Sequence, residues 1–78
     1  MSENTKIKYD PNGLLDQVKT LNHLGSDAEL AAFLQVAPPV IGKIRHLKMR
    51  VGDSMILRCI EYAGMTAPQV RAYIGVQP

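Results

Sequence analysis

Apolar residues recur at helical spacing in five short stretches between residues 11 and 75. Within each stretch the apolar positions lie three or four residues apart, which places them on one face of a helix. Glycine, proline and polar residues separate the stretches, and none of them predicts a strand. The pattern therefore predicts one all-α domain of five helices over residues 11–78, preceded by a flexible arm over residues 1–10.

Two helix starts are marked by side chains that satisfy free backbone N–H groups. Ser26 is followed three residues later by Glu29, and Thr66 is followed at the same spacing by Gln69. In this capping box, each side chain accepts a hydrogen bond from the other residue's backbone N–H. We therefore expect helices to begin directly after Ser26 and Thr66.

Proline and glycine predict further boundaries. Asp10 before Pro11 is typical of a turn, or of an N-cap with proline in the first helical position. Gly25 is expected to take a left-handed conformation at the end of the first helix. Pro38 and Pro39 lack a backbone donor, so they must end the second helix near residue 35 and begin the third. The fourth helix is expected to start within residues 52–54.

The expected core is aliphatic. Hydrophobic residues make up 46% of the 78 positions, but only one Phe, three Tyr and no Trp are present. Cys59 is the single cysteine, so an intrachain disulfide is impossible and a small buried apolar role is expected. The spacing assigns to this core Leu14, Leu15, Val18, Leu21, Leu30, Ala31, Leu34, Ile41, Ile44, Met55, Ile56, Cys59, Ile60 and Ala63, and it places Val70, Tyr73 and Ile74 on a further apolar stripe.

The distribution of apolar residues also indicates where in the cell the protein is expected to be. The longest uncharged stretch, residues 30–42, is too short and too interrupted by proline to span a bilayer. The first residues do not have the basic and then apolar order of a secretory signal. We expect a cytoplasmic protein with no membrane contact.

Positive charge is concentrated in one segment, although the formal net charge is only +2. Four Lys or Arg residues and His46 fall within residues 43–50, and no acidic residue occurs between Glu29 and Asp53. Such a run is usually a solvated face. Its place directly after two expected helices makes it a candidate for binding nucleic acid.

Residues 26–46 resemble the helix-turn-helix of the Cro and CI repressors of phages and of the wider Xre family. Apolar residues occupy the matching positions, namely Leu30, Ala31, Leu34, Val36, Ile41 and Ile44. The chain departs from the family pattern at two turn positions, where Gln35 replaces the usual glycine and Ala37 the usual serine. A non-glycine residue can hold the left-handed turn, and proline can partly replace a cap.

The resemblance implies a five-helix, lambda-repressor-like domain that binds double-stranded DNA in a sequence-specific manner. It further implies a bacterial or phage-encoded transcriptional repressor that covers its operator as a homodimer, with the third helix in the major groove. The residues placed on or near DNA are Pro38, Pro39, Val40, Gly42, Lys43, Arg45, His46, Lys48 and Arg50, with Ser26 at the start of the supporting helix.

These residues are expected to divide between bases and phosphates. Lys43 is the best candidate for reading bases, because an ammonium can donate to guanine O6 and N7; a phosphate contact is nearly as favourable. The cations from Arg45 onward are expected to hold phosphates, as is the N-terminus near Ser26, although Asp27 opposes an anion there. Val40 or Pro39 can touch a thymine methyl. Gly42 is either a tolerated weak point in the helix or a place where the backbone approaches DNA closely.

The sequence offers little support for an enzymatic or metal-binding function. No nucleophile beside a base, paired carboxylates or phosphate loop is visible, so we expect neither an enzyme nor a cofactor. A metal site is not expected from two distant histidines and one cysteine. The alternative is an antitoxin-type module whose helix-turn-helix domain also contacts a protein such as a toxin.

Two surface roles remain open in the sequence. Apolar residues near the C-terminus can be core or dimer surface, with a slight preference for a dimer role at Tyr73 and Val76 over Met65, Val70 and Ile74. Lys6 and Lys8 are either part of a disordered tail or reach an adjacent groove of DNA.

Overall fold

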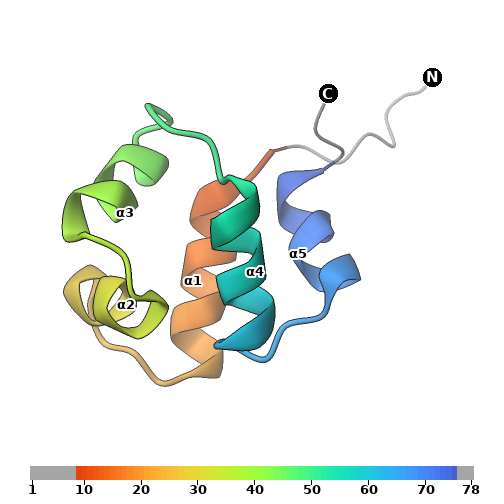
Figure 1. The fold of residues 1–78 in the computed structure, drawn as a ribbon, viewed down its shortest axis with the longest axis horizontal. Helices are drawn as coiled ribbons and strands as arrows, with labels where there is room; N and C mark the ends of the chain where they lie inside the picture. The colour runs from red at the N-terminus through yellow and green to blue at the C-terminus, as the bar shows by residue number, and fades with distance from the viewer. Residues whose placement is uncertain (1–8, 76–78) are drawn as a thin grey trace.

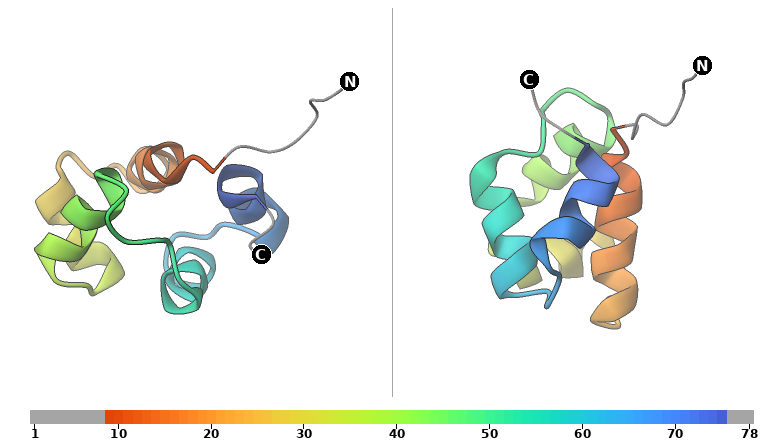
Figure 2. Two further views of the ribbon diagram at one scale, coloured as in Figure 1. Left: turned by 90° about the horizontal axis from the view of Figure 1, so that it is seen from above. Right: turned by 90° about the vertical axis from the view of Figure 1, so that its right-hand side faces the viewer.

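The computed structural model describes residues 9–75 and places five helices along them. They are α1 (Pro11–Leu21), α2 (Asp27–Leu34), α3 (Pro38–Arg45), α4 (Asp53–Glu61) and α5 (Ala67–Ile74). No strand occurs within residues 9–75, so the expected all-α class and the number of helices are confirmed. Seen from above, α1 and α4 are viewed nearly end-on, with α2 and α3 to one side and α5 to the other (Figures 1 and 2).

The capping expected at α5 is confirmed in full. The Gln69 backbone N–H donates to Thr66 Oγ1 at 3.2 Å, and the Thr66 N–H donates to Gln69 Oε1 at 2.9 Å. At α2 only half of the box forms. Ser26 Oγ accepts from the Glu29 N–H at 3.2 Å, but Glu29 Oε1 accepts from Gly25, one residue before Ser26, at 2.7 Å.

The helix ends show which residues take the left-handed conformation. Gln35 does so at φ 59°, as its place in the turn required. The expectation for Gly25 is wrong, because α1 already ends at Leu21 and His23 occupies the left-handed position at φ 58°. Leu47, after α3, is left-handed at φ 62°, which the sequence did not predict.

The buried side chains form one aliphatic cluster. Met65, Val70 and Ile74 belong to it, so these three residues near the C-terminus are core and not surface. Leu21 was expected in the core but is 46% exposed, since it is the last residue of α1. The cluster consists of Leu14, Leu15, Val18, Leu30, Ala31, Leu34, Ile41, Ile44, Val51, Met55, Cys59, Ala63, Met65, Val70 and Ile74.

Two residues assigned to the arm are joined to the folded domain. The Tyr9 ring packs against the core, and its hydroxyl accepts a hydrogen bond from the Val51 N–H at 2.9 Å. The Asp10 N–H donates to the Tyr73 carbonyl at 2.6 Å, which links the start of α1 to α5. Lys6, Lys8 and Val76 lie outside the described residues.

Candidate nucleic-acid interface

Helices α2 and α3 pack against each other across a connection of residues 35–37. The turn is closed by the Val36 N–H, which donates to the Ala31 carbonyl at 2.9 Å. Ala31 is small and 1% exposed, and Val36 packs against the core from the turn. Ile41 and Ile44 are buried one turn apart, so they fix which side of α3 faces outward.

A network of polar side chains ties α3 to α1 and α2 through Arg45. Its guanidinium binds Asp27 with two hydrogen bonds, Nε to Oδ2 at 2.7 Å and Nη2 to Oδ1 at 2.9 Å. Nη2 also donates to Asp16 Oδ1 at 2.9 Å, and Nη1 to Asn12 Oδ1 at 2.8 Å. Asn12 completes the link by donating from Nδ2 to the Arg45 carbonyl at 3.0 Å.

The charge of Asp27 is balanced inside this network. The Arg45 guanidinium lowers the pKa of Asp27 mainly by donating hydrogen bonds to the carboxylate, against a smaller opposing effect of burial. Asp27 in turn raises the pKa of Arg45, again chiefly through the hydrogen bonds. Lys19 Nζ approaches Asp27 Oδ1 at 3.3 Å and adds a second cation. The carboxylate at the start of α2 is therefore matched by two neighbouring cations.

Other predicted contact residues lie on the outer side of α3 and in the loop that follows it. Pro38, Pro39, Lys43, His46 and Lys48 are all exposed. Within residues 9–75, the side chains of the last three form no ion pair or hydrogen bond. We call Lys43 and Lys48, with His46 between them in the sequence, the cationic surface of α3.

The remaining predicted residues are placed differently. The Arg45 side chain is only 20% exposed and is engaged with Asp27, so the structure does not bring it to the cationic surface. Val40 packs partly against the core. Ser26 Oγ is occupied in capping α2, whose first turn also carries Asp27 and Glu29. Gly42 has open space where a Cβ would stand.

Arg50 is exposed and lies over the ring of Tyr9, with its guanidinium carbon 4.9 Å from the ring centre. This distance is within the range of a cation–π interaction. The contact links the loop after α3 to the residues before α1, and it was missed because Tyr9 had been assigned to the arm.

The interior polar network was also missed by the sequence. Asn12 and Asp16 stand 33 and 29 positions before Arg45, and no local pattern joins residues so far apart. The signal available in the sequence was an acidic residue in the first turn of one helix, Asp27, and an Arg at the end of the next helix, Arg45. That signal is too common to identify a contact.

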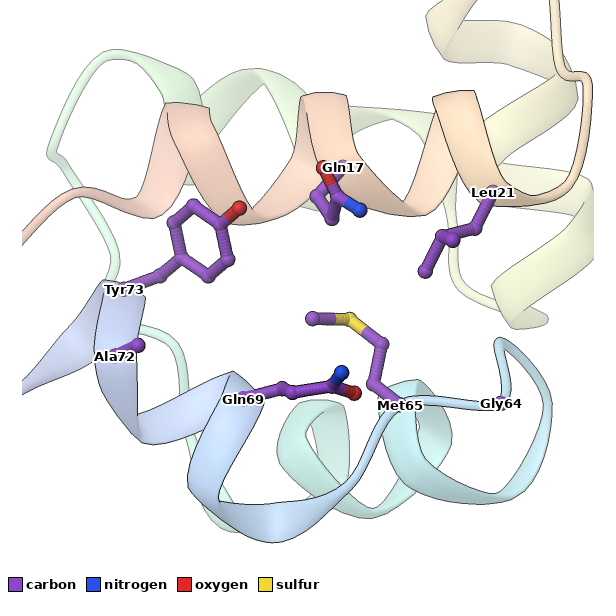
Figure 3. Close-up of a pocket in the computed structure, with 7 residues that line it drawn as sticks. All are labelled: Gln17, Leu21, Gly64, Met65, Gln69, Ala72 and Tyr73. Atoms are coloured by element: carbon purple, nitrogen blue, oxygen red, sulfur yellow. The ribbon is translucent and has the colours of Figure 1, made fainter.

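A pocket of about 300 Å³ opens between α1 and α5, away from the cationic surface of α3 (Figure 3). Gln17 and Leu21 face Tyr73 and Gln69 across it, with Met65 between them. It is lined by Gln17, Leu21, Gly64, Met65, Gln69, Ala72 and Tyr73 and has no charged side chain. The amide of Gln69 already caps α5. The pocket is therefore lined by apolar and uncharged polar side chains.

Three further features of residues 9–75 constrain the chemistry of the domain. No group of three or more His, Cys, Asp or Glu side chains there is placed to hold a metal ion. Cys59 is buried, and burial raises the pKa of its thiol to about 11, so the thiol stays protonated at neutral pH. None of the helices in this region has the length and hydrophobicity needed to cross a membrane.

Comparison of the chain with protein-family models, with curated proteins and with solved structures gives no match.

Proposed function

We propose that the protein is a sequence-specific double-stranded DNA-binding regulator of the helix-turn-helix, lambda-repressor-like kind. In this proposal α2 supports α3, and α3 lies in the major groove with its outer side toward the bases. The observation that carries the proposal is the division of charge on α3. Its one inward cation is neutralised by carboxylates, whereas Lys43, His46 and Lys48 remain together on the outside.

The cationic surface suits a duplex for a physical reason. Cations without acidic partners can neutralise phosphates and release condensed counterions, which drives binding to DNA. Lys43 lies within α3 and is proposed to read a base edge, with Val40 and Pro39 available for apolar contact. Lys48 and His46 follow α3 and are proposed to contact phosphates. Arg45 and Ser26 are left out, because their polar side-chain atoms are used within the protein.

Regulation is proposed to act by occupancy. A single small domain makes few base contacts, so two copies on an inverted repeat with half-sites about one helical turn apart are expected. A dimer that covers a promoter blocks polymerase, which makes the protein a repressor. Tyr73 is half-buried at the rim of the α1–α5 pocket and remains available for the dimer surface.

The test is selection of duplexes from a random-sequence pool with the purified protein, followed by titration of the enriched duplex at several salt concentrations. We expect an inverted repeat to be enriched and its affinity to fall steeply with salt. No enrichment and no binding at low salt would remove the proposal.

Two lysine variants test the placement of α3. Lys43→Ala should change which sequences are enriched, with discrimination at one base pair reduced by about 1–3 kcal/mol. Lys48→Ala should weaken all duplexes alike and reduce the salt slope by about one. The opposite result would show that α3 is oriented differently in the groove.

A further inference from the structure

Leu47 is an exposed apolar side chain in a conformation that disfavours it. The residue follows α3, it is 66% exposed, and its φ is 62°. Left-handed backbone crowds the Cβ of every L-residue, so glycine is the residue usually found there and asparagine the next most common. Burial in the core therefore does not explain why a leucine occupies this left-handed position.

The ends of α1 and α2 provide a direct comparison for the backbone conformation at Leu47. The same pair of backbone hydrogen bonds closes α1, α2 and α3, with left-handed residues His23, Gln35 and Leu47. After α3, Leu47 N–H donates to the Ile44 carbonyl at 3.1 Å and Lys48 N–H to the Lys43 carbonyl at 2.8 Å. This is the Schellman motif.

The order of polar and apolar residues is reversed in the third motif. After α1 and α2, the left-handed residue is polar, and the next residue, Leu24 or Val36, packs against the core. After α3, the left-handed residue is the exposed Leu47, and the next residue is Lys48. The motif after α3 therefore directs an apolar side chain to the surface, where the other two direct one inward.

The surroundings of Leu47 indicate what can cover it. Lys43, His46 and Lys48 are exposed beside it in the sequence, and Met49 is a second, partly exposed apolar residue. No acidic residue lies between Glu29 and Asp53. A partner that covers this surface would therefore need to combine negative charge with apolar groups. A DNA backbone does so, because its phosphates alternate with deoxyriboses and base edges.

We propose that Leu47 makes an apolar contact with the DNA duplex, against a sugar and base edge between the base contacted by Lys43 and a phosphate held by Lys48. This inference rests on the proposed function and adds to it a contact that carries no charge. It predicts that part of the affinity does not depend on salt, because apolar contact releases no phosphate counterions.

The experiment compares Leu47→Gly with His23→Gly, its matched control after α1. Both substitutions put glycine at a left-handed position, so both should raise the midpoint of thermal unfolding by roughly 4 °C. Affinity is measured for the duplex enriched by the unaltered protein and for a mixed-sequence duplex. Leu47→Gly should bind both about tenfold more weakly with an unchanged salt slope, and His23→Gly should bind like the unaltered protein. Leu47→Asn, which also tolerates this backbone, should bind as weakly as Leu47→Gly.

The outcomes separate this inference from the proposed function. Duplex binding that is equal in the unaltered protein and in Leu47→Gly overturns the role of Leu47 and leaves the proposed function standing. No duplex binding by the unaltered protein overturns both. If sedimentation shows that Leu47→Gly abolishes self-association while each bound copy keeps its affinity, Leu47 serves a protein contact and the inference is wrong.

Discussion

Lys43 and Arg45 stand two positions apart on α3 and have opposite surroundings. Two residues turn a helix by about 200°, so their side chains leave it on nearly opposite sides. Arg45 faces α1 and α2 and binds Asp27, Asp16 and Asn12, whereas Lys43 is exposed and has no ion-pair partner within residues 9–75. The basic residues counted along the sequence are therefore of two kinds. Arg45 is bound within the fold, whereas Lys43 is exposed and can bind a partner.

The basic segment over residues 43–50 is not one uniform charged surface. Part of its charge is internal, because Arg45 is paired with carboxylates on two other helices. That pairing and the burial of Ile41 and Ile44 together fix the rotation of α3 about its own axis relative to α1 and α2. The outward direction of Lys43 thus depends on the inward attachment of Arg45.

The largest expected effect comes from removing the inward cation. Arg45→Ala deletes hydrogen bonds that reach α1 and α2 and leaves two carboxylates without their main partner. Hydrogen bonds to charged groups contribute roughly 1.5–3 kcal/mol each. Because Asp27 and Asp16 are partly exposed and can be rehydrated, we expect a total loss of about 2 kcal/mol and a fall in Tm of about 10 °C. Thermal and urea unfolding followed by circular dichroism measure this loss.

Lys43→Ala is the matched control on the same helix. It should change the free energy of unfolding by less than about 0.5 kcal/mol, as surface substitutions usually do. Equal losses in both variants would show that the contrast between the two faces of α3 is not real.

The sequence predicted the helices better than the contacts between them, for a physical reason. Helix starts depend on residues three or four positions apart, so the cap of Thr66 with Gln69 and the break at Pro38 could be read directly. The direction of Arg45 depends on Asn12 and Asp16, which meet it only after three helices have packed. Arg45 was therefore grouped with the phosphate contacts.

The core positions show the same limit. Spacing correctly identified Ile41 and Ile44 as buried, because both lie on the apolar face of one helix. Val51 lies in the connection before α4, where no period exists to indicate burial, yet it is only 3% exposed and its N–H binds the Tyr9 hydroxyl. Leu21 fitted the period of α1 but lies at the end of the helix, where packing is incomplete.

A smaller effect should appear in how the free energy of unfolding depends on pH, because of the ion pair between Asp27 and Arg45. The pKa of Asp27 is lowered in the folded state, so its ion pair stabilises the protein above the unfolded pKa near 3.8 and is lost as pH falls through the folded value. Asp27→Asn should therefore destabilise the protein by about 1 kcal/mol at pH 7, and the difference from the unaltered protein should shrink as the pH falls below 3.8 and through the lowered pKa of the folded state. Urea unfolding at a series of pH values measures the difference.

Asp53→Asn controls for the position of the charge. Asp53 is the first residue of α4 as Asp27 is of α2, so both carboxylates interact with the start of a helix, but only Asp27 pairs with Arg45. The control should lose less stability than Asp27→Asn at pH 7. A difference between Asp27→Asn and the unaltered protein that stays constant down to pH 2 would show that the ion pair does not stabilise the fold.

The smallest effect concerns Gly42, which lies between the two faces of α3. Nothing stands within 4 Å of a Cβ built on it, so Gly42→Ala should stabilise the protein by about 0.5–1 kcal/mol through the higher helix propensity of alanine. If the backbone of α3 approaches DNA closely at this point, the added methyl group will weaken duplex binding while it stabilises the fold. If Gly42 is only a weak point in the helix, binding will be unchanged or slightly stronger. Measuring the unfolding midpoint and the duplex affinity on one preparation decides between these two interpretations. Stability rises while duplex affinity falls only if the backbone of α3 approaches DNA closely at Gly42.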